Sequence, residues 1–282
     1  MLQRKEMIMS IKNKIIIAVS VLGLTFNIVL AQDANKIVVD GSTTVGPIAK
    51  AFAEYYMKLN PGVNVSIGES GSGNGAKSLV NGVCDIATMS RAMKDKEKKS
   101  AEDAGRLPIS NIIAMDGLAI IVHPSNPVQN LTIEQIRKIY TGEIKNWKEL
   151  GGPDKAIVVI SRDTNSGTYE TFESMVMNKQ KIADNAEYVG SNGAIRQRVS
   201  GTEGAIGYVG LAFLEGVKTV KVENVEASPE NVKSKKYPIS RPLYMYTNGK
   251  PKEGTNLHGF LNLYKTKEGK KIIDDLGYVS VD

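Results

Sequence analysis

Residues 36–52, KIVVDGSTTVGPIAKAF, join a strand, a turn and a helix in one short unit, and the fold prediction rests on this unit. The β-branched run Lys36–Asp40 predicts a strand, and Gly41–Gly46 predicts the turn that follows it. Pro47 is typical of the first turn of a helix, where its missing N–H is not needed. Four apolar side chains then recur at a helical spacing and predict one buried face: Ile48, Phe52, Tyr55 and Leu59.

The same order of strand, loop and helix recurs further along the chain. Val63–Ile67 predicts a second strand, a glycine-rich loop follows it, and residues 74–81 predict the next helix. In the second half, residues 156–160 predict a strand, 161–167 a polar loop and 168–177 a helix. Strands that alternate with helices in this way are typical of an α/β fold.

The remaining segments fit the same fold class. Thr132 and Gln135 form a capping box, which predicts a helix that ends near Tyr140. Pro238 and Pro242 predict that the strand containing them lies at a sheet edge, because proline cannot donate to a ladder. Further strands are predicted at 85–89, 112–122, 205–209 and 237–246, and further helices at 194–199, 256–264 and 267–276. No obvious linker divides the chain, so we expect any two domains to exchange segments rather than follow one another.

Length and composition exclude several classes of protein. The 282 residues suffice for one large or two modest domains, and the 41% apolar content excludes a wholly disordered chain. The one cysteine, Cys84, excludes a disulfide scaffold and is expected to be a small buried apolar residue. With only two histidines, His123 and His258, a Cys/His zinc site is excluded, and we expect neither a metal nor a cofactor.

The first 31 residues have the pattern of a secretory signal peptide. Four basic residues precede Ile15–Leu30, an uncharged and mostly apolar run of 16 residues, and Ala31 ends a small-residue cleavage site. A transmembrane anchor is the alternative, although an anchor normally needs about 20 apolar residues. No cysteine follows the run, which argues against a lipid anchor. We therefore expect an exported, periplasmic protein whose mature chain starts near Gln32.

The charge pattern does not indicate a nucleic-acid partner. The formal net charge is +6, and removal of residues 1–31, with four bases and one acid, would leave +3. The densest basic cluster, 94–99 (KDKEKK), contains two acids. A groove for a polyanion needs a continuous basic stripe with interleaved aromatic residues, and we expect no nucleic-acid binding.

Three loops rich in glycine, serine and threonine each join a predicted strand to a predicted helix. They are 41–46 (GSTTVG), 69–75 (ESGSGNG) and 162–168 (RDTNSGT). Helix N-termini offer unpaired N–H groups and a positive dipole end, and glycine lets the backbone approach a ligand closely. Since open α/β sheets bind ligands beyond the carboxyl ends of their strands, the three loops together predict a site for a small oxyanion. Ordinary helix capping is the alternative for each loop taken alone.

On these loops and the segments around them, the chain resembles the phosphate-binding proteins of ABC phosphate transporters, within the type II periplasmic binding protein superfamily. The matching stretches span nearly the whole mature chain: 40–52, 68–91, 116–127, 131–147, 161–172 and 204–210. The resemblance implies two lobes, each a mixed sheet flanked by helices, that are joined by two hinge crossings and close over one phosphate. We expect a signal peptide at 1–31, lobe I at 32–120 and 208–282, and lobe II at 121–207.

Carried over residue by residue, the resemblance implies three ligand-binding segments and no catalytic residue. The segments are the first loop with Ser42, Thr43 and Thr44, the second with Ser72 and Gly73, and an Arg-x-x-x-Ser-Gly-Thr segment with Arg162, Ser166, Gly167 and Thr168. In the family, the arginine and the helix N-terminus of the last segment hold the ligand.

The resemblance also implies that Ser90 and Arg91 bind phosphate. This pair falls where some members carry Ser-Asp, whose aspartate accepts the phosphate proton; other members read Ser-Arg, as here. A carboxylate that accepts the O–H of phosphate and repels sulfate must then come from elsewhere. Asp116, which interrupts an apolar run, and Asp163, beside Arg162, are the candidates, and we place Asp116 first. The alternatives are a salt bridge or turn cap for Asp116 and orientation of Arg162 for Asp163.

These observations predict a monomeric binding protein, not an enzyme, that delivers inorganic phosphate to the permease subunits of an ABC importer in the inner membrane. A binding protein for sulfate, molybdate or tungstate is the nearest alternative, and a surface or sensory phosphate binder without a transporter is another. An exported serine hydrolase is the enzyme alternative. It lacks support because no Gly-x-Ser-x-Gly elbow occurs and only His123 and His258 could supply an imidazole base.

Overall fold

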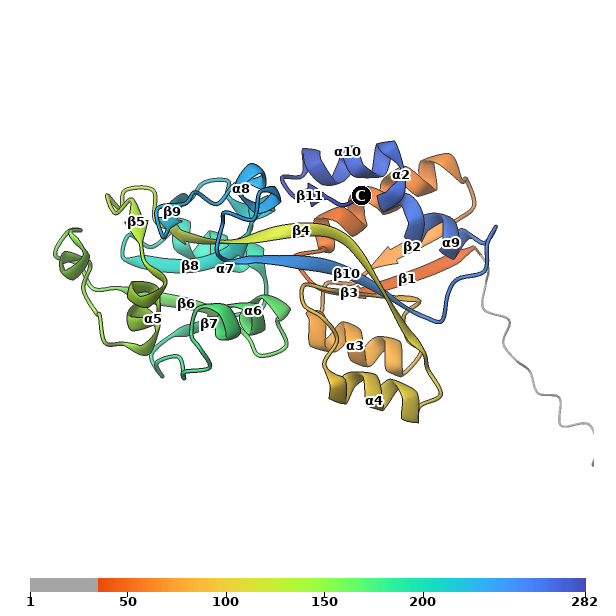
Figure 1. Ribbon diagram of the computed structural model, residues 1–282, viewed down its shortest axis with the longest axis horizontal. Helices are drawn as coiled ribbons and strands as arrows, with labels where there is room; N and C mark the ends of the chain where they lie inside the picture. The colour runs from red at the N-terminus through yellow and green to blue at the C-terminus, as the bar shows by residue number, and fades with distance from the viewer. Residues whose placement is uncertain (1–34) are drawn as a thin grey trace, which may run out of the picture. The chain divides into compact units, whose positions relative to one another are not determined.

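The computed structural model describes residues 35–282, which form the predicted α/β fold. The described strands lie in the order β2-β1-β3-β10-β4-β8-β6-β7, with helices on both faces (Figure 1). The predicted signal peptide, residues 1–31, lies outside the described residues. Within residues 35–282, no helix is both long enough and apolar enough to cross a membrane.

The first part of the sheet is built from the strand–loop–helix units that the sequence predicts. The strands β1 (Lys36–Gly41), β2 (Asn64–Ile67) and β3 (Ile86–Met89) pair in parallel. Parallel neighbours need a crossover, and here the crossovers are α2 (Gly46–Leu59) and α3 (Ser72–Val80). The second of these helices starts two residues earlier than predicted.

The buried face of α2 differs from the prediction at one position. Ile48, Phe52 and Tyr56 follow each other at steps of four and are buried. Tyr55 is partly buried, as a residue beside that stripe should be. Leu59 was expected on the buried face, but its exposed fraction is 60% because it lies in the last turn, where the chain leaves the sheet.

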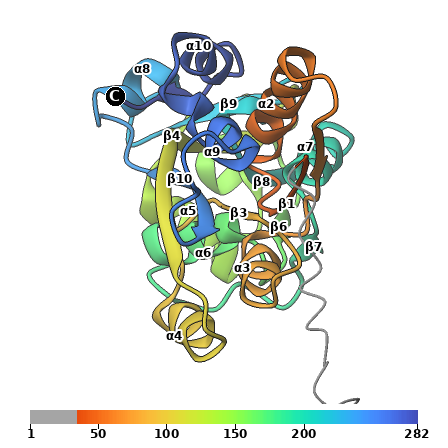
Figure 2. The same ribbon diagram turned by 90° about the vertical axis from the view of Figure 1, so that its right-hand side faces the viewer.

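Two long strands connect the two parts of the sheet. β4 (Pro108–Val122) and β10 (Ser240–Asn248) are antiparallel neighbours and lie side by side in both views (Figures 1 and 2). Residues 113 and 114 of β4 belong to one hydrophobic core, whereas residues 118–122 belong to another. β10 likewise has Leu243 in the first core and follows Ile239, which lies in the second. Both chain crossings therefore run through extended strands rather than loops.

The predicted edge position of the proline-containing strand is wrong, because β10 lies between β3 and β4. Pro242 nevertheless fits there for a simple reason. β10 pairs with β4 from Ser240 onward, but it pairs with β3 only from Tyr244 onward. The strand has one partner at Pro242, so the missing N–H leaves no ladder position empty.

The second part of the sheet contains β8 (Ala205–Gly210), β6 (Val158–Arg162) and β7 (Glu187–Val189). β6 starts and ends two residues later than predicted. The predicted capping box is confirmed at α5. Thr132 Oγ1 accepts the Gln135 N–H at 3.0 Å, and Gln135 Oε1 accepts the Thr132 N–H at 2.9 Å. The helices of this part are α5 (Ile133–Thr141), α6 (Gly167–Met175) and α7 (Asn192–Ser200).

The remaining elements are short. They are α4 (Asp95–Asp103), β5 (Asn130–Leu131), β9 (Lys218–Val222), α8 (Pro229–Lys233), α9 (Asn256–Leu261), α10 (Lys267–Asp275) and β11 (Val279–Ser280). The sequence analysis treated the start of α4 only as a charge cluster. Its one buried residue is Ala101, so the segment carries almost no apolar periodicity by which to predict a helix.

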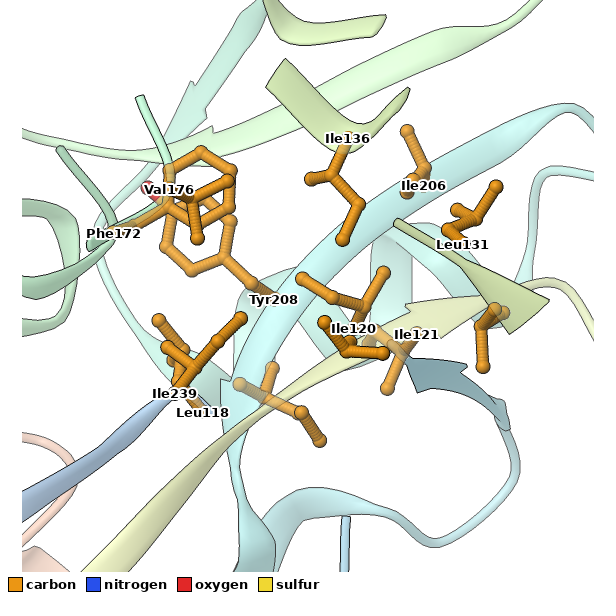
Figure 3. Close-up of a cluster of buried hydrophobic side chains, with 14 of the residues drawn as sticks. Leu118, Ile120, Ile121, Leu131, Ile136, Phe172, Val176, Ile206, Tyr208 and Ile239 are labelled. Atoms are coloured by element: carbon orange, nitrogen blue, oxygen red, sulfur yellow. The ribbon is translucent and has the colours of Figure 1, made fainter. Parts of the chain in front are cut away.

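The larger hydrophobic core lies under β8, β6 and the ends of β4 and β10 (Figure 3). The Phe172 ring of α6 stacks on the Tyr208 ring of β8 with centroids 4.1 Å apart and 8° between the planes. The Tyr208 hydroxyl lies 2.8 Å from Ser161 Oγ and accepts the Arg162 N–H at 3.1 Å. This contact fixes the end of β6, from which the predicted arginine loop starts.

The lobe boundaries at 120/121 and 207/208 stay a prediction. The two hydrophobic cores indicate where a division into lobes would fall. Residues 118–122 and the stretch from Ala205 to Ile239 contribute to the same core, whereas Leu243 and Met245 pack with α2, α9 and α10. Cys84 lies buried beside α3, in agreement with its predicted role as a small apolar residue.

Replacement of Phe172 by Ala should lower the free energy of unfolding by about 3–5 kcal/mol, because it removes a stacked ring from a dry core. Chemical denaturation of the ligand-free protein measures this change directly. Tyr188→Ala is the control, since that ring is half-exposed on β7 and its loss should cost within about 0.5 kcal/mol. Equal losses in the two variants would contradict the assignment of the core.

Candidate functional site

The three predicted loops each join a strand to a helix, and they meet one another at the carboxyl ends of their strands. They connect β1 to α2, β2 to α3 and β6 to α6. The Gly73 N–H at the start of α3 donates to the Asn165 carbonyl at 3.0 Å. The Thr44 and Thr168 hydroxyls lie 2.9 Å apart although 124 residues separate them. The first and third loops therefore bring these two hydroxyl groups into hydrogen-bonding contact.

In the first loop, one residue caps the turn and the next two contact a distant asparagine. Ser42 Oγ accepts from the Thr44 and Val45 N–H groups at 3.1 and 3.4 Å, so Ser42 caps its own turn. Thr43 and Thr44 point their hydroxyls to Asn192, whose Nδ2 donates to both at 2.9 and 3.0 Å. All of these side chains are buried.

The second loop meets the third through small residues. Ser72 Oγ accepts the Ser90 N–H at 3.1 Å and lies 3.4 Å from Ser90 Oγ. A Cβ on Gly167 would lie 2.5 Å from Ser72 Oγ and 2.7 Å from Ser90 Oγ. Only glycine permits this approach, which brings the N-terminus of α6 against both serines. Ser166 caps α6 by accepting from the Thr168 and Tyr169 N–H groups at 3.1 and 3.2 Å.

Arg162 is buried at the end of β6, and backbone carbonyls hold its guanidinium. Nε donates to the Val189 carbonyl at 3.2 Å and Nη2 donates to the Gly190 carbonyl at 2.8 Å. Burial lowers the pKa of Arg162 to about 10. Even so lowered, the side chain remains cationic at neutral pH, so it can attract an anion to the loops.

Arg91 is placed differently from the other predicted site residues, because two carboxylates hold its guanidinium. Nη1 and Nη2 each lie 2.8 Å from a Glu97 oxygen, and Nε lies 2.7 Å from Glu170 Oε2. Burial disfavours the charge, but the Glu97 hydrogen bond and both carboxylate charges outweigh it and raise the pKa of Arg91. Lys94 Nζ also lies 2.9 Å from Glu170. The cluster ties the β3–α4 segment to α6, and a direct ligand contact by Arg91 stays a prediction.

Asp116, the predicted proton acceptor, is fully buried in an ion pair with Arg241. Oδ2 accepts from Arg241 Nη2 at 2.9 Å and Nε at 3.1 Å, and Oδ1 accepts the Leu211 N–H at 3.0 Å. Burial raises the pKa of Asp116, and the Arg241 charge opposes this shift. Asp116 thus makes a salt bridge, as the alternative expected. The role of Asp116 as proton acceptor stays a prediction. Asp163 Oδ1 accepts the Asn165 N–H at 2.9 Å.

Three residues of this region were missed by the sequence analysis: Asn192, Arg241 and Tyr278. Asn192 starts α7 after a Gly-Ser pair, a fourth loop of the same kind that could have been recognised from GSNG at 190–193. Arg241 and Tyr278 had no such signal. The Tyr278 hydroxyl donates to the Thr44 carbonyl at 2.5 Å. Within the described part of the chain, no group of three or more His, Cys, Asp or Glu side chains could hold a metal.

Replacement of Asp116 by Asn should lower the free energy of unfolding by about 3–5 kcal/mol, because the buried Arg241 charge would lose its partner. Thermal and denaturant unfolding of the ligand-free protein give this value. The double variant Asp116→Asn/Arg241→Gln should recover much of the loss, since it leaves no unpaired charge. A double variant that is less stable than Asp116→Asn would contradict this account of the pair.

Comparison with known proteins agrees with the fold. The family model of the PBP superfamily domain matches residues 30–265. A protein named phosphate-binding protein PstS from Staphylococcus saprophyticus is 37% identical over 255 residues, which cover 86% of this chain and 79% of that protein. Another protein of the same name from Borreliella burgdorferi is 33% identical and covers 89% of this chain and 92% of that protein.

Solved structures show the same likeness. A Clostridium perfringens protein crystallised with bound phosphate superposes with a TM-score of 0.82 at 38% identity and covers 88% of this chain and 100% of that one. An ABC-type phosphate transport receptor from Vibrio cholerae gives a TM-score of 0.70 at 33% identity, with 86% and 99% covered.

Proposed function

We propose that this chain, which belongs to the PBP superfamily and within it to the phosphate-binding proteins of ABC phosphate transporters, binds inorganic phosphate outside the cytoplasm and delivers it for import. The observation that carries the proposal is the meeting of hydroxyl-bearing helix N-termini at one place. α2, α3 and α6 all begin there, and Thr44 and Thr168 face each other at 2.9 Å. Helix N-termini and neutral hydroxyls are suited to a tetrahedral anion.

Binding proceeds without covalent chemistry. Neutral donors from Thr43, Thr44, Ser72, Ser90 and Thr168 disperse the charge of the anion. Arg162 supplies a fixed positive charge beside them. The hydrolase alternative needs an imidazole near one of these serines. Instead, His123 Nδ1 lies 2.7 Å from Ser125 Oγ in an exposed turn, so we propose a binding protein and not an enzyme.

The two strands that join the cores, β4 and β10, suggest how phosphate is captured and released. β4 and β10 carry the chain between the two cores, and the site lies where loops from both cores meet. Contacts such as Thr44–Thr168 bridge the two sides, so a ligand held by both sides shifts the population toward the closed form. We infer that the closed form docks, as a monomer, on the permease subunits of an ABC importer.

The expected location agrees with this role. Proteins that hand substrate to an importer act outside the cytoplasm, and the basic and then apolar pattern of residues 1–31 is that of an export signal. We propose that the chain is cleaved near Ala31 and works in the periplasm.

Isothermal titration of the phosphate-stripped protein with phosphate, then with sulfate, tests the proposal. We expect one phosphate per chain and no competition by excess sulfate. Thr168→Val should weaken phosphate binding by about ten- to hundredfold, because it removes a donor to a charged ligand. Thr171→Val, on the same helix but bonded to the Gly167 carbonyl, is the matched control and should keep its affinity. Binding of sulfate alone would assign the site to another oxyanion.

The ion pair between Arg91 and Glu170 should favour the closed form. Glu170→Gln removes one carboxylate that ties α6 to the β3–α4 segment, and it should weaken phosphate binding by about three- to tenfold. Glu173→Gln on the same helix contacts Tyr169 instead and serves as the control. If the two variants bind phosphate equally, the pair has no part in closure.

A further inference from the structure

Arg241 is a buried cation beside the first of the three loops. It lies on β10 directly opposite Asp116 on β4, and only 3% of the residue is exposed. Asp116 Oδ2 takes one edge of its guanidinium, through Nε and Nη2. A guanidinium has five N–H donors in a rigid fork, so one carboxylate oxygen cannot satisfy it.

The opposite edge of the guanidinium is left for another acceptor. Nη1 is buried and makes no hydrogen bond to any residue in the range 35–282. Nη2 lies 3.4 Å from Thr44 Oγ1, the hydroxyl that also faces Thr168 and receives Asn192. A charged donor that is buried without a partner is costly, and a bound ion is one of the partners that can satisfy it.

The charges around Arg241 also favour a bound anion. Burial is the main cause of the lowered pKa of Arg162, and the positive charge of Arg241 adds to it. The two buried guanidinium groups therefore lie close enough to repel each other. Arg91 brings no further net charge, because Glu97 and Glu170 both contact it. The buried charged side chains within residues 35–282 are two cations, Arg162 and Arg241, and one anion, Asp116. The partly buried Asp163 also attracts Arg162.

We infer that Arg241 is a second cationic ligand of the bound phosphate, held in place by Asp116 and presented beside Thr44. The inference rests on the proposed function and adds a residue that neither the loops nor their motifs contain. It also gives Asp116 a different task from accepting the phosphate proton. Both carboxylate oxygens already receive donors, so Asp116 orients Arg241 toward the anion.

The test uses phosphate titrations of the stripped full-length mature protein and three variants. Arg241→Lys keeps a charge beside Asp116 but loses the second guanidinium nitrogen, and we expect about tenfold weaker binding. Asp116→Asn/Arg241→Gln leaves no unpaired charge to unfold the protein, and we expect binding at least about 30-fold weaker. Asp116→Asn alone keeps the Arg241 charge but orients it less firmly, and we expect phosphate binding about three- to tenfold weaker than in the unmodified chain.

A matched control removes an ion pair from the surface. The Arg198→Gln/Glu187→Gln double variant neutralises an exposed pair of similar geometry and should bind phosphate like the unmodified chain. The phosphate-induced rise in melting temperature is the second readout. It should shrink in both Arg241 variants, whereas a purely structural role would lower both melting temperatures and keep the difference.

Two results would overturn the inference alone. The first is equal phosphate binding by the unmodified chain and the Asp116→Asn/Arg241→Gln variant. Arg241 would then be only the ion-pair partner of Asp116. Asp116→Asn could lose binding as fully as the double variant, which would make Asp116 the group that binds. An unmodified chain that binds no phosphate would overturn the proposed function and this inference together.

Discussion

The buried ion pair between Asp116 and Arg241 is the constraint on which the arrangement of the site depends. The two residues face each other across β4 and β10, the strands that carry the chain from one core to the other. A buried pair is more stable when its remaining donors and acceptors also find partners. Here Asp116 accepts the Leu211 N–H and Arg241 Nη2 lies 3.4 Å from the Thr44 hydroxyl, which links both crossing strands to the loop at 41–46. Arg241 Nη1 has no hydrogen-bond partner within residues 35–282. Packing next to it is equally tight, since a Cβ on Gly210 would lie 3.0 Å from Asp116 Oδ2 and from Thr44 Cγ2.

The capping and ligand-binding explanations of the glycine-rich loops turn out to be compatible. Ser42 and Ser166 satisfy N–H groups of their own turns, which is the ordinary task of such residues. Their neighbours Thr44 and Thr168 are thereby placed with their hydroxyls toward each other. The first and third loops thus each use several small polar residues, because one serine satisfies nearby N–H groups and a later threonine turns its hydroxyl toward the other loop.

The fold could be predicted well from the sequence, because its signals are local. A β-branched run, a glycine turn and a helix start lie within a few residues of each other, and the structure reproduces that order at α2, α3 and α6. The errors occur where local signals are weak or ambiguous. The charged helix α4 has one buried residue, and Pro242 sits in an inner strand because its second neighbour starts two residues later.

The sequence by itself determined the α/β class, the three glycine-rich loops between strand and helix, and the arginine that starts the third, since each is encoded within one continuous stretch. Only the tertiary structure decided which distant residues lie beside these loops. Arg241 lies 197 residues from Thr44 in the chain, and Asn192 lies 148 residues from it. Arg91, close to the second loop in sequence, is instead held by Glu97 and Glu170. Such contacts depend on how the sheet orders its strands, and no local pattern of residues records that order.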